Sequence, residues 1–227
     1  MVEIEVWMNG FTEKLVNEFG ARLLFLGLQG SYGRGEANED SDIDVVTVLD
    51  RVELADLDAY RAAVREMPEG EKACGFLCGA VELKGWPKYD LCQLARDVRG
   101  YHGALGTLLP PIGRADLAEA AAIGASGLSH AAVHTYLYAG RESWPEFLKE
   151  AHKGAFFTLR ALHELRTGEN VRAKRDLLPL LGGDEREVLA YSLSPADEPL
   201  ECVFDRLIRW SAAAMAEAEQ SRDTKFP

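Results

Sequence analysis

Two aspartates, Asp42 and Asp44, stand one residue apart at the start of an apolar run. If that run forms a β-strand, both carboxylates leave the same face of it, about 6.5 to 7 Å apart. Hard cations such as Mg²⁺ take oxygen ligands, and two such ions can activate an attacking oxygen and stabilise a leaving one at phosphorus. The pair therefore predicts metal-dependent chemistry at a phosphate. The alternative is a turn-capping role, because Asp and Ser also favour turns.

A glycine-rich segment, residues 30–35, precedes the aspartates and contains Ser31. Glycine adopts positive φ and allows close backbone approach, so amide groups and the Ser31 hydroxyl can point at a triphosphate. The apolar run 23–28 ends just before this segment and predicts a strand, so we expect a polar loop that joins two strands. The segment is therefore predicted to be a phosphate-binding turn beside the aspartates.

The N-terminal part of the sequence has the pattern of an α/β domain. Helical periodicity, ended by glycine or proline, predicts helices at residues 11–19 and 52–67. Short apolar runs predict strands at residues 23–28, from 43 onward, at 73–78 and at 89–94. We expect a small mixed sheet with flanking helices.

The second part of the sequence, after Leu109-Pro110-Pro111, is rich in Ala and Leu and is helical in its periodicity. Glycine and proline breaks separate four predicted helices at residues 116–139, 145–167, 184–193 and 199–219. Such a set of helices predicts a bundle. The predicted fold class is therefore α+β, with an α/β domain at residues 1–108 and an all-α helical bundle at residues 109–227.

The stretch 30–44 resembles the nucleotidyltransferase superfamily of the DNA polymerase β type. The pattern of that superfamily is Gly-Ser, a loop, and then Asp-hydrophobic-Asp. The matching positions are Gly30, Ser31, Arg34, Gly35, Ala37, Ser41, Asp42, Ile43 and Asp44. The resemblance implies that Asp42 and Asp44 bind the catalytic Mg²⁺ ions. It also implies nucleotide binding by Gly30, Ser31, Arg34 and Ser41.

Members of this superfamily usually supply a third carboxylate from a later strand of the same sheet. Asp90 lies in a matching apolar context within the predicted strand 89–94. By resemblance, Asp90 would complete the metal site or act as the general base on the acceptor hydroxyl. Asp97 is the alternative, and in a regular strand it would point to the opposite face from Asp90.

The helical part resembles the C-terminal bundle of streptomycin and spectinomycin adenylyltransferases. In those enzymes a helix carrying an Arg runs into a Thr-Gly turn that is followed by a Lys, and both basic residues contact nucleotide phosphates. The same order is present here in Arg160, Thr167-Gly168 and Lys174. The resemblance therefore implies that Arg160 and Lys174 bind the nucleotide, although Arg172 and Arg175 lie close to the Lys position.

The net charge of the chain indicates which classes of partner it can bind. The chain has 25 Lys and Arg against 37 Asp and Glu, a net charge of −12, which disfavours nucleic acid and anionic membranes and favours a cationic or neutral acceptor. No uninterrupted apolar run approaches the roughly 18 residues of a membrane span, and the N-terminus carries Glu3 and Glu5 in place of a basic leader. We expect a cytoplasmic protein.

These features predict an enzyme that transfers AMP from ATP to a hydroxyl of a small molecule such as an aminoglycoside, with release of pyrophosphate. A role in antibiotic resistance would follow. Two alternatives stay open: transfer to a protein or RNA acceptor, and a nucleotide-binding regulatory or antitoxin-like module without catalysis. Function resides in the site and not in the fold, so fold resemblance does not select the acceptor.

Overall fold

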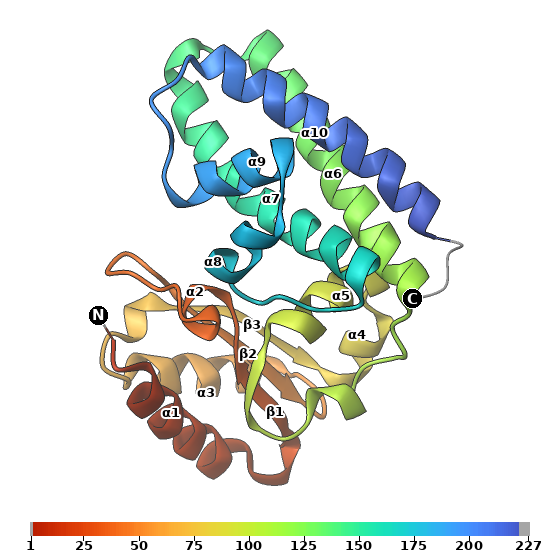
Figure 1. Ribbon diagram of the computed structural model, residues 1–227. Coiled ribbons are helices and arrows are strands. Elements are labelled where there is room, and N and C mark those ends of the chain that lie inside the picture. The colour runs from red at the N-terminus through yellow and green to blue at the C-terminus, as the bar shows by residue number, and fades with distance from the viewer. Residues whose placement is uncertain (1, 223–227) are drawn as a thin grey trace. The chain divides into compact units, whose positions relative to one another are not determined.

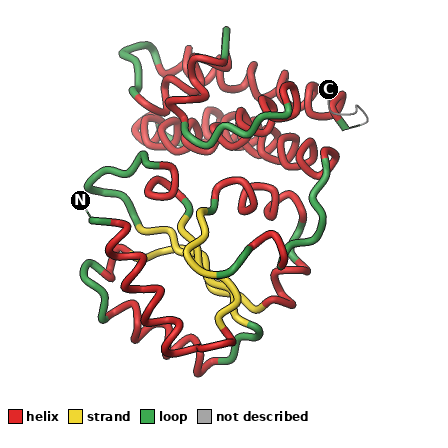
Figure 2. The backbone as a smooth tube through the Cα atoms, turned by 60° about the horizontal axis from the view of Figure 1, so that its bottom comes forward, coloured by secondary structure: helices red, strands yellow, loops and turns green. Residues whose placement is uncertain are grey.

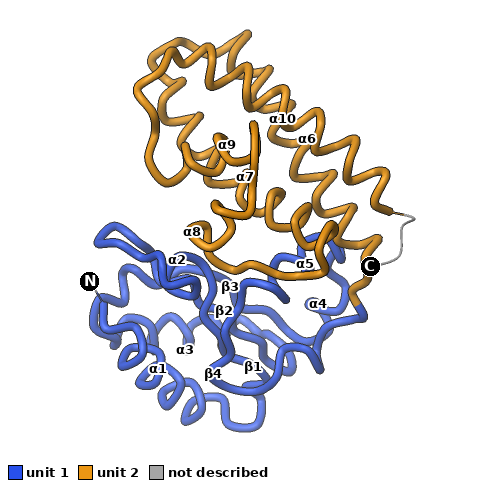
Figure 3. Tube along the Cα trace, viewed as in Figure 1, with its two compact units in different colours: residues 1–111 blue, residues 112–227 orange. Residues whose placement is uncertain are grey.

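The computed structural model describes residues 2–222, and the chain divides into two compact units (Figure 3). Unit 1 comprises residues 1–111 and unit 2 comprises residues 112–227. The division falls three residues beyond the boundary expected from the sequence. Each unit has its own core and is described by itself.

Unit 1 is a small mixed sheet with helices beside it (Figures 1 and 2). Its helices are α1 (Ile4–Phe19), α2 (Gly30–Arg34), α3 (Leu54–Arg65), α4 (Ala80–Gly85) and α5 (Lys88–Asp97). Its strands are β1 (Leu23–Leu28), β2 (Ile43–Leu49), β3 (Ala73–Gly79) and β4 (Arg99–His102). The strand order is β3-β2-β1-β4, and β2 pairs parallel with β3 while β1 pairs antiparallel with β2 and β4.

The core of unit 1 decides which way the aspartates point. Ile43, Val45 and Leu49 of β2 are fully buried in one cluster with apolar residues of α1 and α3. Because side chains alternate along a strand, Asp44 leaves the opposite face of β2. Since Ile43 and Val45, its two neighbours in the strand, face this core, Asp44 is kept out of it.

Two sequence predictions for unit 1 are wrong. The predicted strand at residues 89–94 belongs instead to helix α5, which buries Leu91, Cys92 and Leu94 at helical spacing after Pro87. A short apolar run fits either structure, and here helical packing decides. The segment between β1 and β2 is not loop throughout, because its first part is the one-turn helix α2. Helix α1 also begins earlier than expected, at Ile4.

Unit 2 is a helical bundle, as predicted (Figure 1). Its helices are α6 (Arg114–Tyr138), α7 (Trp144–Thr167), α8 (Lys174–Leu177), α9 (Gly183–Leu193) and α10 (Leu200–Ser221). Helix α6 packs against α7 and α10, and α7 packs against α9. Gly168 ends α7 in the left-handed conformation, with φ +78°, which is the predicted glycine stop. Together the two units give the α+β class that the sequence predicts.

Short 3₁₀ turns connect several of these elements. They span Gly20–Arg22, Gly70–Lys72, Leu105–Thr107, Arg141–Ser143 and Leu178–Leu180. Among the helices of residues 2–222, none combines the length and the apolar character that crossing a bilayer requires.

A histidine lies inside the helical bundle. The His152 side chain is fully buried, donates from Nδ1 to the Leu148 carbonyl oxygen at 2.6 Å, and packs against Tyr191 with ring centroids 4.4 Å apart. Burial lowers the pKa of His152 to about 4, and the positive charge of Arg206 acts in the same direction. The folded protein therefore holds a neutral imidazole at neutral pH.

We predict that His152 makes unit 2 sensitive to mild acid. Between pH 6.5 and pH 4 the unfolded chain binds a proton at this position and the folded chain does not, so stability falls as pH falls. The loss should reach about 3 kcal/mol at pH 4 and should be absent above pH 7. Urea unfolding across this range should give a smaller pH dependence for His152→Phe, which keeps an aromatic ring against Tyr191.

The matched control is His134→Phe, because His134 is exposed on α6. That variant should keep the wild-type pH dependence of unfolding. Equal pH dependence in the wild type and in His152→Phe would contradict the prediction.

Candidate active site

The two aspartates lie at the N-terminal end of β2. Asp42 immediately precedes the strand and is exposed, whereas Asp44 is its second residue and is half-buried. The Asp44 carbonyl oxygen accepts a hydrogen bond of 2.9 Å from the Gln29 amide. The glycine-rich segment is therefore joined to the strand that carries the carboxylates.

Gly30 lies directly against the Asp44 carboxylate. Its φ is +67°, and a Cβ atom built on it would fall 1.8 Å from Asp44 Oδ2. Both the conformation and the lack of space require glycine at this position. The structure therefore brings Gly30 and Asp44 together, and it gives a steric reason for the Gly-Ser pair that the sequence shows only as a pattern.

The rest of the segment forms a single helical turn. Ser31 is partly exposed within α2, and its carbonyl oxygen accepts the Glu36 amide at 2.8 Å. Gly35 ends the turn with φ +70°. Gly33 has a different role, because a Cβ there would fall 2.9 Å from the Leu28 carbonyl oxygen. The turn is thus packed closely onto the end of β1.

A buried carboxylate, Asp97, contacts the turn from the end of α5. Its Oδ2 accepts the Gly30 amide at 3.1 Å and Arg34 Nη1 at 2.8 Å, and Asp97 is 5% exposed. Arg34 also donates from Nε to Glu36 Oε2 at 3.1 Å. These contacts of Arg34 are with carboxylates of its own domain, and its predicted contact with nucleotide stays a prediction.

The structure places Asp90 and Asp97 on one helix. Both belong to α5, where residues seven apart share a face and lie about 10 Å apart along the axis. The expectation that they point to opposite faces is wrong, because it assumed a strand. Asp97 approaches the turn, and Asp90 is exposed in the first turn of the helix. The predicted role of Asp90 as a metal ligand or base stays a prediction.

Negative charge is concentrated around Asp44. Its pKa is raised, first by burial, then by the neighbouring charges of Asp42 and Asp97, while Arg34 opposes them. A divalent cation between Asp42 and Asp44 would offset this repulsion, and carboxylate oxygens are the donors that Mg²⁺ takes. The pair thus fits such an ion. Over residues 2–222, His, Cys, Asp and Glu side chains form no ready-made cluster of three or more for a metal.

Ser41 holds the loop before β2. Its hydroxyl accepts the Asn38 amide at 2.9 Å and lies 3.2 Å from Asn38 Oδ1. These contacts close a short turn ahead of Asp42. The direct contact of Ser41 with nucleotide that the resemblance implies stays a prediction.

Sequence reasoning missed the residues of β3 beside Asp44. The parallel register pairs Cys74 with Asp44, so Cys74 and Phe76 lie on the Asp44 face of the sheet. Phe76 packs against Trp86 with ring centroids 5.0 Å apart. The sequence of β3, Ala73–Gly79, contains no carboxylate. The alternation of Cys74, Phe76 and Cys78 is the sequence signal that could have identified this face.

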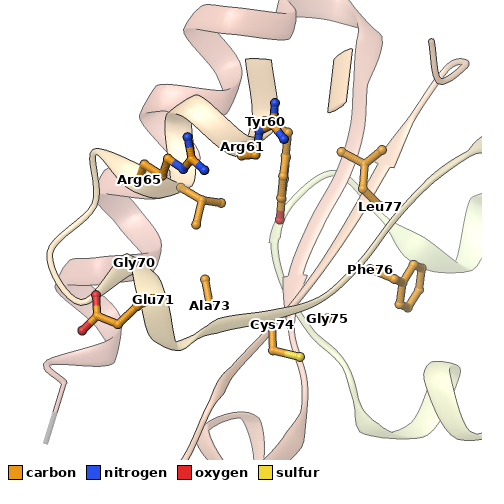
Figure 4. Close-up of a pocket in the computed structure, with 11 residues that line it drawn as sticks. Tyr60, Arg61, Arg65, Gly70, Glu71, Ala73, Cys74, Gly75, Phe76 and Leu77 are labelled. Atoms are coloured by element: carbon orange, nitrogen blue, oxygen red, sulfur yellow. The ribbon is translucent and has the colours of Figure 1, made fainter. Parts of the chain in front are cut away.

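A cavity of about 590 Å³ opens along the outer strand of the sheet (Figure 4). It is lined by the last turns of α3, including Arg61 and Arg65, by Glu71 and by β3 residues 73–77. Of the residues described around Asp44, only Cys74 and Phe76 line the cavity. Asp42 and Asp44 do not line it. The cavity is therefore not the candidate active site.

In unit 2, the two basic residues that are predicted to bind nucleotide lie near one aromatic ring. Arg160 is 2% exposed on α7, with its guanidinium carbon 5.3 Å from the Phe156 ring centroid. Lys174 Nζ, at the start of α8, is 5.9 Å from the same centroid. The predicted contact of Arg160 and Lys174 with nucleotide stays a prediction.

The region that contains the turn and the two aspartates matches a known protein family. Residues 12–92 match the family model described as "Nucleotidyltransferase domain". The chain carries a nucleotidyltransferase domain. The match contains the turn, Asp42 and Asp44, and it ends before Asp97. The predicted membership in the nucleotidyltransferases, and with it the predicted enzyme class, is confirmed.

The fold of the whole chain is similar to that of a solved nucleotidyltransferase structure. That structure is spectinomycin adenyltransferase AAD(9) from Enterococcus faecialis with ATP and spectinomycin. The TM-score is 0.55 at 14% sequence identity, and the alignment covers 95% of this chain and 99% of the other. A search of curated proteins found no match. The similarity shows a shared fold that includes the helical unit.

We predict that Gly30→Ala disrupts the site of the nucleotidyltransferase domain. The new Cβ would displace the Asp44 carboxylate, in addition to a conformational cost of about 1 kcal/mol for alanine at positive φ. Nucleotidyl transfer should fall at least about a hundredfold, because a displacement of about 1 Å is enough for such a loss. Pyrophosphate release and urea unfolding would measure the two effects.

Gly35→Ala is the matched control. Gly35 also has positive φ, but a Cβ atom added to it would meet nothing within 4 Å. This variant should lose only the conformational cost of about 1 kcal/mol, without the large loss of transfer. Wild-type rates of transfer in Gly30→Ala would contradict the steric role.

Proposed function

We propose that this protein is a Mg²⁺-dependent adenylyltransferase that moves AMP from ATP to a hydroxyl of a small-molecule acceptor. The observation that carries the proposal is the pairing of Asp42 and Asp44 with Gly30 packed on the Asp44 carboxylate, inside a nucleotidyltransferase domain. Support for ATP comes from the solved structure of similar fold, whose name includes ATP and an adenyltransferase activity.

The proposed reaction is an in-line displacement at the α-phosphorus. The acceptor hydroxyl oxygen forms a bond to the α-phosphorus, and the bond from that phosphorus to the oxygen bridging the α- and β-phosphates breaks. Pyrophosphate leaves, and the hydroxyl proton passes to a general base, for which Asp90 is our candidate. Mg²⁺ held by Asp42 and Asp44 would supply charge neutralisation at the phosphates, and two ions are the usual number for this chemistry.

The turn is proposed to hold the phosphates. Ser31 would contribute its hydroxyl and backbone amide beside the metal ligands, while Gly30, whose own amide is bonded to Asp97 Oδ2, would allow the phosphates to approach closely. For Arg34 and Ser41, which the resemblance implies as nucleotide ligands, the observed bonds to Glu36, Asp97 and Asn38 favour a role in shaping the loop. We therefore assign the direct phosphate contacts of this segment to Ser31, with Gly30 as the residue whose lack of a side chain leaves room for the phosphates.

Arg160 and Lys174 are proposed to bind nucleotide phosphates as well. Their shared position at the Phe156 ring supports this, because two neighbouring cations match the charge of a triphosphate. Charge-assisted bonds of this kind stabilise the charge that develops on the phosphates during transfer.

For the acceptor, we propose a cationic small molecule of the aminoglycoside or aminocyclitol type. The net charge of −12 favours a cation, and the name of the solved structure of similar fold includes spectinomycin. Addition of AMP to such a compound would inactivate an antibiotic. Transfer to protein or RNA, and nucleotide binding without catalysis, are the alternatives that an assay must separate.

We predict that Asp42→Asn and Asp44→Asn abolish transfer. Each replaces a charged ligand by a neutral amide, so pyrophosphate release from ATP with Mg²⁺ and an aminoglycoside panel should fall about a thousandfold or more. Asp40→Asn, at an exposed neighbouring position, is the control and should keep its activity. Circular dichroism should show intact folds in all three.

Release of pyrophosphate by Asp42→Asn at the wild-type rate would contradict the metal role. A wild type that binds ATP yet releases no pyrophosphate with any acceptor would favour the binding module. Labelling of protein or RNA in place of the small molecules would favour the other acceptor classes.

Lys174→Gln should raise the KM for ATP about tenfold, because it removes one charge-assisted bond to phosphate. Lys153→Gln on α7 is the control, since Lys153 is exposed and pairs with Glu150. Steady-state kinetics with ATP as the varied substrate would measure both. An unchanged KM for ATP in Lys174→Gln would remove this residue from the proposed site.

A further inference from the structure

We propose that Asp97 is a positioning residue that fixes the phosphate turn against Asp44, with its Oδ2 serving as a hydrogen-bond acceptor for the turn and not as a metal ligand. This inference rests on the proposed function of the turn. Asp97 lies beyond the stretch that matches the family model, and the sequence offers it only as an alternative ligand. Its contacts in the structure assign a different role.

One oxygen atom of Asp97 ties together both ends of α2. Oδ2 accepts the amide of Gly30, the first residue of the helix, and the guanidinium of Arg34, the last residue. The distances are 3.1 Å and 2.8 Å, and the carboxylate is buried. A charge-assisted bond in a buried setting is stronger than a neutral or solvated one. Asp97 therefore anchors the turn electrostatically at both of its ends.

The same bonds argue against metal coordination through that oxygen. A carboxylate oxygen has two lone-pair directions, and both are directed at N–H donors here. A cation at Oδ2 would have to displace the Gly30 amide or Arg34, either of which would leave a buried polar group without this bond. Oδ2 is thus a hydrogen-bond acceptor for the turn.

Asp97 and the next residue, Val98, are also packed closely onto the turn and onto β1. A Cβ on Gly27 would fall 2.7 Å from Val98 Cγ2, and a Cβ on Gly33 would lie 3.8 Å from the Asp97 carbonyl oxygen. The following strand, β4, pairs Arg99 with Leu28 of β1. Asp97 is therefore held in place by the sheet as well as by α5. Its hydrogen bond to the Gly30 amide then fixes Gly30.

The position of Gly30 matters because it has no clearance from Asp44. A shift of the turn toward β2 would push Gly30 into the carboxylate, and a shift away would separate Ser31 from the metal ligands. Asp97 thus acts on nucleotide binding through Gly30 and Arg34, without touching the nucleotide.

The test uses Asp97→Asn and a matched variant, Asp56→Asn. Asp56 is also a buried carboxylate of unit 1, and it binds Arg22 through both oxygens at 2.8 Å. Arg22 also bonds Asp50, so this pair lies beyond the end of β2 opposite to the one that carries Asp44. Both variants lose one carboxylate–arginine pair and should lose comparable stability. A merely structural role would therefore affect both alike.

Two measurements separate the outcomes. Hydrogen exchange of the peptide covering residues 29–36 should accelerate in Asp97→Asn and stay unchanged in Asp56→Asn. Binding of a non-hydrolysable ATP analogue with Mg²⁺, measured by calorimetry, should weaken about tenfold or more in Asp97→Asn alone. The Mg²⁺ concentration for half-maximal transfer should stay within about twofold of the wild type at saturating ATP, whereas a lost ligand would raise it strongly.

Unchanged exchange at residues 29–36 in Asp97→Asn would overturn the anchor. Faster exchange with unchanged affinity for the ATP analogue would overturn the positioning role, because the turn would then not govern nucleotide binding. If the wild type bound no ATP analogue while exchange still accelerated, the anchor would stand and the proposed function would fail.

Discussion

The close approach of Gly30 to the Asp44 carboxylate is the constraint on which the candidate site depends. A single added methyl group at residue 30 would lie 1.8 Å from a carboxylate oxygen, so the turn and the strand cannot be placed independently. The Gln29 amide bonds to the Asp44 carbonyl oxygen and tightens the same junction. The order Gly-Ser, loop, Asp-hydrophobic-Asp thus encodes a steric fit as well as a set of reactive groups.

The close packing of the turn on β2 concentrates negative charge around Asp44. Asp42, Asp44, Asp97 and Glu36 lie in one region, where Arg34 is bonded to two of them. The pKa of Asp44 is raised first by burial and then by the negative charges of Asp42 and Asp97. A divalent cation bound by Asp42 and Asp44 would lower the repulsion and would bring phosphates to the turn, since Mg²⁺ usually shares its coordination with substrate phosphates. The same cation would therefore both reduce the repulsion between the carboxylates and bind the phosphates of a nucleotide.

Sequence reasoning succeeds where the signal is local. The apolar run that begins at Ile43 predicts the strand β2, and long helical periodicity predicts the four main helices of unit 2. It fails where a short run fits two structures, because residues 89–94 are apolar enough for a strand and only packing at helical spacing selects α5. The bond from Gly30 to Asp97 joins residues 67 positions apart through that helix. Such a contact follows from packing and not from propensity, so the sequence pattern could not reveal it.

The order of Arg160 and Lys174 is visible in the sequence, but the burial of Arg160 is not. A cation that is 2% exposed loses most of its hydration, which is costly unless other groups replace it. The rings of Phe156 and Phe157, with centroids 5.3 Å and 5.4 Å from its guanidinium carbon, replace part of that hydration through their negative faces. A guanidinium held beside two rings also has few rotamers left to lose when an anion binds. In the proposed role of Arg160, this fixed position would lower the entropic cost of binding a phosphate, which is an advantage that a flexible, solvated arginine lacks.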